Sequence, residues 1–124
     1  MSRKSARRDA LFVLYQWDVT GTPLASLHEG ELDSYTQELV DGVSGEAVEL
    51  DARINAASSD WSADRLGALE RNVLRIALWE LERGDVPLEA AIDEAVSLAK
   101  RYSSEDAGRL VNGILGRVVR EAAR

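Results

Sequence analysis

The sequence contains no cysteine, and histidine occurs only once, as His28. The absence of thiols excludes disulfide bonds, thiolate nucleophiles and cysteine-ligated zinc, and it favours a cytoplasmic protein. His28 stands among residues typical of a surface loop, so we expect no metal site. The sequence also lacks any run of about 18 apolar residues that would span a membrane, and no signal peptide follows its basic start.

The motifs of common catalytic sites are missing as well. The sequence has no phosphate-binding glycine loop, no HExxH and no GxSxG pattern. Adjacent acidic residues such as Asp93 and Glu94 are expected at helix starts or on polar helix faces, where carboxylates are favourable. We therefore expect neither an enzyme nor a cofactor.

Strand signals are absent too, whereas apolar residues recur at helical spacing throughout the 124 residues. A first helix is expected to end at Gly21, and a central helix, apolar on two neighbouring stripes, is expected to end at Gly84. Ser103, three residues before Asp106, resembles a capping box for the last helix. Five to seven helices with short connections predict an all-α bundle, forming a single domain over residues 1–124.

Charge is distributed unevenly along this chain, whose formal net charge is −7. Residues 1–8 carry four cations and no acid, whereas residues 9–60 carry eleven acids and one arginine. The remaining residues, 61–124, hold ten bases and eleven acids. Because charges farther apart than about 8 Å are screened at physiological salt, a basic patch at the start is not cancelled by distant acids.

The four cations of the start form two rows if the segment is helical. Arg3 and Arg7 are one turn apart, and so are Lys4 and Arg8. Tyr15 and Gln16 follow on the same predicted helix, and such side chains can contact the bases and sugars of single-stranded RNA. This combination predicts an RNA-binding surface; the alternative is a solvated terminus.

The chain also resembles a known family over nearly its whole length. The resemblance rests on five blocks in the same order, "ARRDALFVLYQWD", "YTQELVDGV", "ERNVLRIALWEL", "DVPLEAAIDEAVSLAKRY" and "EDAGRLVNGIL". They are similar to the NusB family of bacterial transcription antitermination factors. The resemblance implies about seven helices in two small subdomains, no catalysis, and binding to boxA RNA of ribosomal RNA transcripts. It also implies a heterodimer with the ribosomal protein NusE, acting with other Nus factors and RNA polymerase.

Residue roles follow from the resemblance only where this sequence matches the family's motifs. The implied RNA-binding residues are Arg3, Lys4, Arg7, Arg8, Asp106 and Leu110. Leu110 departs from the family pattern, in which an aromatic residue here could stack on a nucleobase. Ser5 stands where another basic residue can occur.

Tyr15 and Glu70 match positions that the family uses at the NusE interface. For Glu70, the alternative is an ion pair with a neighbouring arginine on its own helix.

Several other residues are expected to serve packing. Trp79 is predicted to lie in the core, with Arg75 in reach for a cation–π contact, and Trp61 is assigned to the core as well. Asn112 and Gly113 are expected to serve a close helix approach.

Of two other functions, one stays open, and the other is disfavoured by the length of the chain. A helical protein-interaction module, with a homodimer covering the basic face, would keep this fold without useful RNA affinity. The RNA-binding domain of some ribosomal RNA methyltransferases is disfavoured, since no cofactor-binding domain follows in these 124 residues.

Overall fold

The computed structural model describes residues 2–28, 30–58 and 62–122, and these ranges contain six α-helices and no β-strand. The helices are α1 (Arg3–Thr20), α2 (Ser34–Gly45), α3 (Ala47–Ala57), α4 (Ala68–Arg83), α5 (Leu88–Tyr102) and α6 (Glu105–Ala122). Two short 3-10 turns, η1 (Leu24–Ser26) and η2 (Ala63–Arg65), lie in the connections. The predicted all-α fold is confirmed, with six helices where about seven were expected. No helix in the described ranges is long and apolar enough to cross a bilayer.

The helix ends follow local signals in the sequence. Gly21 and Gly84 end α1 and α4 in the left-handed conformation, with φ of 70° and 74°, as the sequence predicts. At the start of α6 the prediction is wrong by one residue. The Ser104 hydroxyl, rather than that of Ser103, accepts a hydrogen bond from the Ala107 N–H at 3.0 Å.

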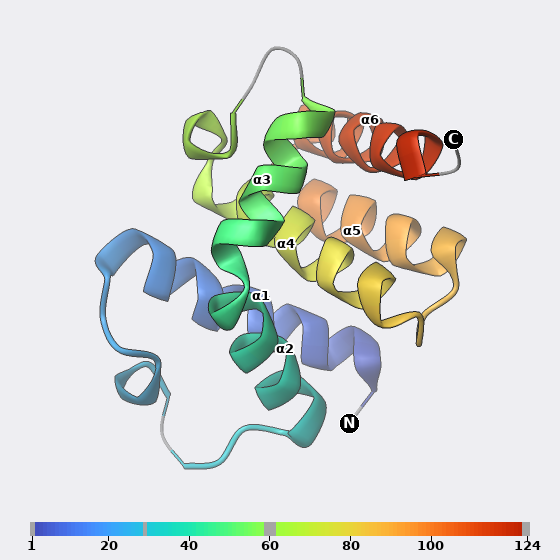
Figure 1. Ribbon diagram of the computed structural model, residues 1–124. Coiled ribbons are helices and arrows are strands. Elements are labelled where there is room, and N and C mark those ends of the chain that lie inside the picture. Colours follow the sequence, from blue (N-terminus) through green and yellow to red (C-terminus); the bar gives the residue numbers. More distant parts are fainter. Residues whose placement is uncertain (1, 29, 59–61, 123–124) are drawn as a thin grey trace.

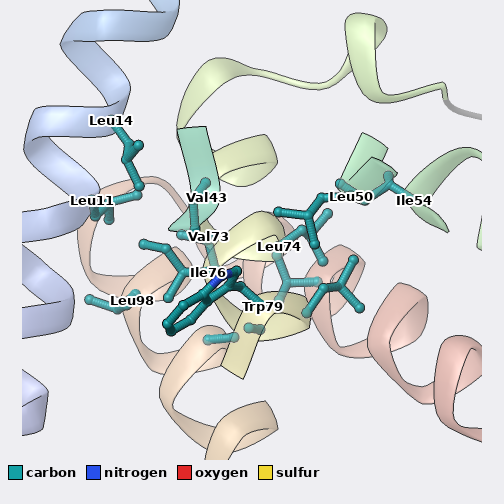
Figure 2. Packing of buried hydrophobic residues seen from close by; sticks show 14 of the residues in the cluster. Leu11, Leu14, Val43, Leu50, Ile54, Val73, Leu74, Ile76, Trp79 and Leu98 are labelled. Atoms are coloured by element: carbon teal, nitrogen blue, oxygen red, sulfur yellow. The ribbon is translucent and has the colours of Figure 1, made fainter. Parts of the chain in front are cut away.

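Helix α4 is the centre of the molecule, as its two apolar stripes predict. It packs against α1 and α2 on one side and against α3, α5 and α6 on the other (Figure 1). The buried apolar side chains join into one cluster across both groups (Figure 2). Its fully buried large members include Leu11, Leu14, Leu39, Leu50, Ile54, Leu74, Ile76, Leu78 and Leu115.

A polar cluster ties the C-terminal part of α1 to α4. Oδ2 of Asp18 accepts hydrogen bonds from Arg71 at 2.7 Å, from Asn72 at 3.0 Å and from Arg75 at 3.2 Å. Arg75 also binds both carboxylate oxygens of Asp51 on α3, each at 2.7 Å. The half-buried Asp18 carboxylate and the buried Arg75 guanidinium therefore link three helices. Bidentate pairs such as Arg75 with Asp51 are among the stronger polar contacts.

Trp79 is 7% exposed, as expected for a core residue, but the predicted cation–π partner is wrong. Arg75 is held by carboxylates, and the guanidinium of Arg83 lies over the indole instead, 4.4 Å from the ring centre. The indole N–H donates to Glu46 at 3.0 Å. Trp61 lies outside the described residues.

The expectation for Asn112 and Gly113 is also wrong. Both residues are exposed on α6, and a Cβ atom built on Gly113 would have no neighbour within 4 Å. The close approach occurs at Gly42 on α2, where a Cβ atom would collide with the Trp79 indole.

Candidate nucleic-acid interface

The basic start is helical from Arg3 onward, so its cations form the two predicted rows. The rows face different parts of the molecule. Arg3 and Arg7 turn toward α2 and α4: the guanidinium of Arg3 lies 4.6 Å from the ring centre of Tyr35. Lys4 and Arg8 turn toward α5, where both line a surface pocket. One short cationic segment therefore serves two different environments.

Arg7 is an interior residue, with 6% of its surface exposed. Its Nε atom donates to both oxygens of Glu80, at 2.8 and 3.0 Å, and Glu80 is 2% exposed. Burial lowers the pKa of Arg7, but the hydrogen bond and negative charge of Glu80 outweigh it, so the pKa is raised. A guanidinium held in this way is not available to a phosphate, so the RNA contact predicted for Arg7 does not fit this conformation.

The half-buried Tyr35 completes this group. Its hydroxyl donates to Glu80, whose carboxylate is thereby shared between α1 and α2. Burial, followed by the hydrogen bond and negative charge of Glu80, raises the pKa of Tyr35 well above its usual range. Tyr35 is therefore a neutral hydrogen-bond donor at physiological pH.

The pocket that receives Lys4 and Arg8 lies between α1 and α5 and has a volume of about 250 Å³. We call it the α1/α5 pocket; its lining is Lys4, Ser5, Arg8, Glu94, Ser97, Leu98, Arg101 and Tyr102. Arg8 is exposed and has only a surface pair with its neighbour Asp9, at 3.1 Å. Arg101 was missed by the sequence analysis, although an arginine directly before an aromatic residue at a helix end was a visible signal.

A second pocket, of about 270 Å³, lies between α4 and α6. This α4/α6 pocket brings together three residues singled out from the sequence, Glu70, Asp106 and Leu110. Asp106 is exposed and pairs with Arg109. The side chain of Leu110 is half-buried against the core. The intrahelical ion pair considered for Glu70 is absent from the described part of the chain, because its carboxylate accepts a hydrogen bond from the Ser103 hydroxyl.

Tyr15 belongs to an exposed apolar stripe on α1. Phe12, Tyr15 and Val19 are 41%, 40% and 57% exposed, and their spacing places them on one helix face. Phe12 is one turn beyond Arg8, so the stripe continues the Lys4 and Arg8 row. The outer face of α1 therefore changes from basic to apolar along its length.

Each of the two pockets is lined in part by a residue at the α5–α6 connection. Tyr102 lines the α1/α5 pocket and Ser104 lines the α4/α6 pocket. Lys4 and Arg8 therefore line the first pocket and Asp106 and Leu110 line the second, whereas Arg3 faces α2. No cluster of three or more His, Asp or Glu side chains that could hold a metal ion occurs in the described ranges.

Comparisons of the sequence and of the fold with known proteins all lead to one family. The sequence profile described as the NusB family matches residues 4–120. The transcription antitermination protein NusB of Rubrobacter xylanophilus is 45% identical over 122 residues, covering 93% of this chain and 88% of the relative. The protein of the same name from Desulforudis audaxviator is 39% identical over 132 residues, covering 98% and 95%.

Solved structures share the fold at similar coverage. A structure of T. maritima NusB superimposes with a TM-score of 0.85 at 31% identity, covering 98% of this chain and 92% of that one. A structure of antitermination factors NusB and NusE in complex with double-stranded RNA superimposes with a TM-score of 0.83 at 33% identity, covering 96% of each chain.

Proposed function

The chain belongs to the NusB family, and from this premise we propose that it is a transcription antitermination factor that binds boxA-type RNA of ribosomal RNA transcripts together with NusE. The proposal is supported by the similar NusB protein whose structure contains NusE and RNA. In this role the protein supports processive transcription as part of a larger complex with other Nus factors and RNA polymerase. It acts in the cytoplasm as a single RNA-binding domain, without catalysis or a cofactor.

The observation that carries the RNA role is the outward-facing row of Lys4 and Arg8. These cations are exposed at the N-terminal end of α1, although the chain as a whole is acidic. Phosphate neutralisation by lysine and arginine supplies most of the affinity in such interfaces and makes it depend on salt. We assign phosphate contacts to Lys4 and Arg8 and, on the side of α1 that faces α2, to Arg3. Further RNA contacts are assigned to Asp106 and Leu110.

The apolar end of the same helix face supports the partner role. Tyr15 is the central residue of the exposed stripe on α1, and aromatic side chains are frequent anchors of protein interfaces. We assign Tyr15 and Glu70 to the NusE interface. A basic ribosomal protein would also be attracted by the acidic segment 9–60.

The proposal is tested by titrating fluorescent boxA-type RNA and a scrambled strand at two salt concentrations, with and without NusE. We expect selective binding that is strengthened by NusE and weakened by salt. Tyr15→Ala should weaken NusE binding measured by calorimetry, with Val48→Ala as a control for loss of an exposed apolar side chain on another helix, α3. Equally weak binding to both strands with NusE present would refute the RNA role.

The exposed apolar stripe also favours a second candidate, a protein-interaction module with little RNA affinity of its own. In that case the stripe would bind NusE or a second copy of the chain. Light scattering of the protein alone, at increasing concentration, distinguishes a homodimer from a monomer that awaits its partner.

A further inference from the structure

We propose that the α1/α5 pocket binds one nucleotide of a single-stranded RNA, with Arg101 contacting its phosphate and Tyr102 stacking on its base. This inference rests on the proposed RNA-binding function and adds residues of α5 to it. The cations that the family resemblance assigns to RNA binding all lie on α1. The structure adds a cation of α5, so that three cations from two helices surround one pocket. These cations are Lys4, Arg8 and Arg101.

The first argument is electrostatic. Three cations and one carboxylate, Glu94, line the α1/α5 pocket, so its net charge is about +2. Within the described residues, Lys4 and Arg101 form no salt bridge, and Arg8 has only its exposed pair with Asp9. Exposed pairs of this kind are weak and are easily exchanged for another anion. The pocket is thus positively charged and free to accept a phosphate.

The second argument is the position of the aromatic ring. The guanidinium of Arg101 lies 5.7 Å from the centre of the Tyr102 ring, so a charge and a stacking surface are adjacent. The rings of Phe12 and Tyr102 pack edge to face, at an interplanar angle of 82° with their centres 5.0 Å apart. This contact restrains Tyr102, which therefore loses little freedom when a base stacks on it. A cation beside an aromatic ring is the arrangement by which proteins hold single-stranded nucleic acid.

The third argument concerns the kind of ligand. A carboxylate such as Glu94 repels a free phosphate, but it accepts hydrogen bonds from the amino groups of bases. At about 250 Å³, the pocket is smaller than sites for drug-sized ligands, which begin near 300 Å³. Its size and mixed lining suit a single nucleotide better than an inorganic anion or a longer segment.

The phosphate contact is tested with Arg101→Ser and a matched control, Arg120→Ser. Arg120 is exposed near the opposite end of α6, so both variants lose one surface charge. Binding of boxA-type RNA to the complex with NusE is measured across a range of salt concentrations. One lost contact to a single strand should reduce the slope of log K against log salt by about 0.7, a loss of about fivefold at 0.1 M salt. Arg120→Ser should retain the wild-type slope.

The stacking contact is tested with Tyr102→Leu and Tyr102→Phe. We expect Tyr102→Leu to lower RNA affinity by about fivefold or more without changing the salt slope, because stacking involves no counterion release. Tyr102→Phe keeps the ring and should bind as the wild type does. Thermal unfolding of each variant shows whether the fold is retained.

The outcomes separate this inference from the proposed function. The proposed function stands if the wild-type protein binds boxA-type RNA selectively. The inference about the pocket fails if, at the same time, Arg101→Ser, Tyr102→Phe and a folded Tyr102→Leu all keep the wild-type RNA affinity and salt slope. If wild-type protein with NusE shows no selective binding, the proposed function and this inference both fail.

Discussion

Arg7 on α1 and Glu80 on α4 form a buried ion pair that joins the basic start of the chain to the central helix. The Nε atom of Arg7 lies 2.8 and 3.0 Å from the two carboxylate oxygens. The two residues are 73 positions apart in the sequence. This pair divides the four cations of the start into one interior residue and three surface residues.

Removing the charge of Glu80 should destabilise the protein strongly. In Glu80→Gln the buried guanidinium of Arg7 loses its counter-charge, and breaking a buried pair in this way costs about 3 to 5 kcal/mol. Urea unfolding measures the change in the free energy of unfolding. Glu82→Gln is the matched control, because Glu82 pairs with Arg53 on the surface and its loss should cost less than about 1 kcal/mol. Equal effects of the two variants would contradict the burial of the Arg7 pair.

Arg7 and Arg8 should respond differently when each is changed to methionine. Arg8→Met should reduce the salt dependence of RNA binding by about 0.7 in slope and leave stability nearly unchanged. Arg7→Met should reduce stability and leave the slope unchanged, since its charge does not reach the RNA. The measurements are RNA titration across salt concentrations and urea unfolding of both variants. A reduced slope in a folded Arg7→Met protein would show that Arg7 does contact phosphate.

Tyr35 should make stability sensitive to alkaline pH. Burial and then Glu80 raise its pKa in the folded protein above the unfolded value of about 10. Its contribution is therefore complete below about pH 10 and is lost as the pH rises toward the folded pKa, by up to about 1.4 kcal/mol per pH unit. Tyr35→Phe should lower stability at neutral pH but flatten this alkaline decline, measured by urea unfolding between pH 8 and 11. Tyr15→Phe, at an exposed tyrosine, should leave the decline as it is in wild type.

Gly113→Ala should stabilise α6. Glycine inside a helix is less stable than alanine by about 0.5 to 1 kcal/mol, and a Cβ atom at this position meets nothing within 4 Å. The contrasting variant is Gly42→Ala, which should destabilise because its Cβ would collide with Trp79. Thermal unfolding gives both signs. A Gly113→Ala protein that is more stable but binds RNA or NusE less well would show that this surface meets a partner.

Features that depend on near neighbours in the sequence could be predicted. Gly21 and Gly84 end helices through their own backbone freedom, and the two stripes of α4 show directly that other helices surround it. The error at Ser103 and Ser104 has a similar local basis, since either serine could cap α6 and only the fold gives Ser103 another partner, Glu70.

Features that depend on distant residues could not be predicted. Spacing shows that Arg3 and Arg7 share a helix face, but not that this face meets Glu80. The same holds for Arg75, whose ion pairs with Asp18 and Asp51 prevent the expected contact with Trp79. The family resemblance supplied Glu70, Asp106 and Leu110 separately, and only the packing of α4 on α6 places them around one pocket.

Helix α1 is fastened to α4 near both of its ends, by Arg7 at one and by Asp18 at the other. Its exposed face is therefore rigid, and distances along it are fixed. Arg8 and Tyr15 are seven residues apart, a rise of about 10 Å along a helix, and the two fastenings hold that spacing constant. The RNA-binding and partner-binding residues of α1 would thus be held at a fixed separation before either ligand binds. Any gain in RNA affinity from the partner would then come from contacts the partner itself adds, and the helix would not have to change shape.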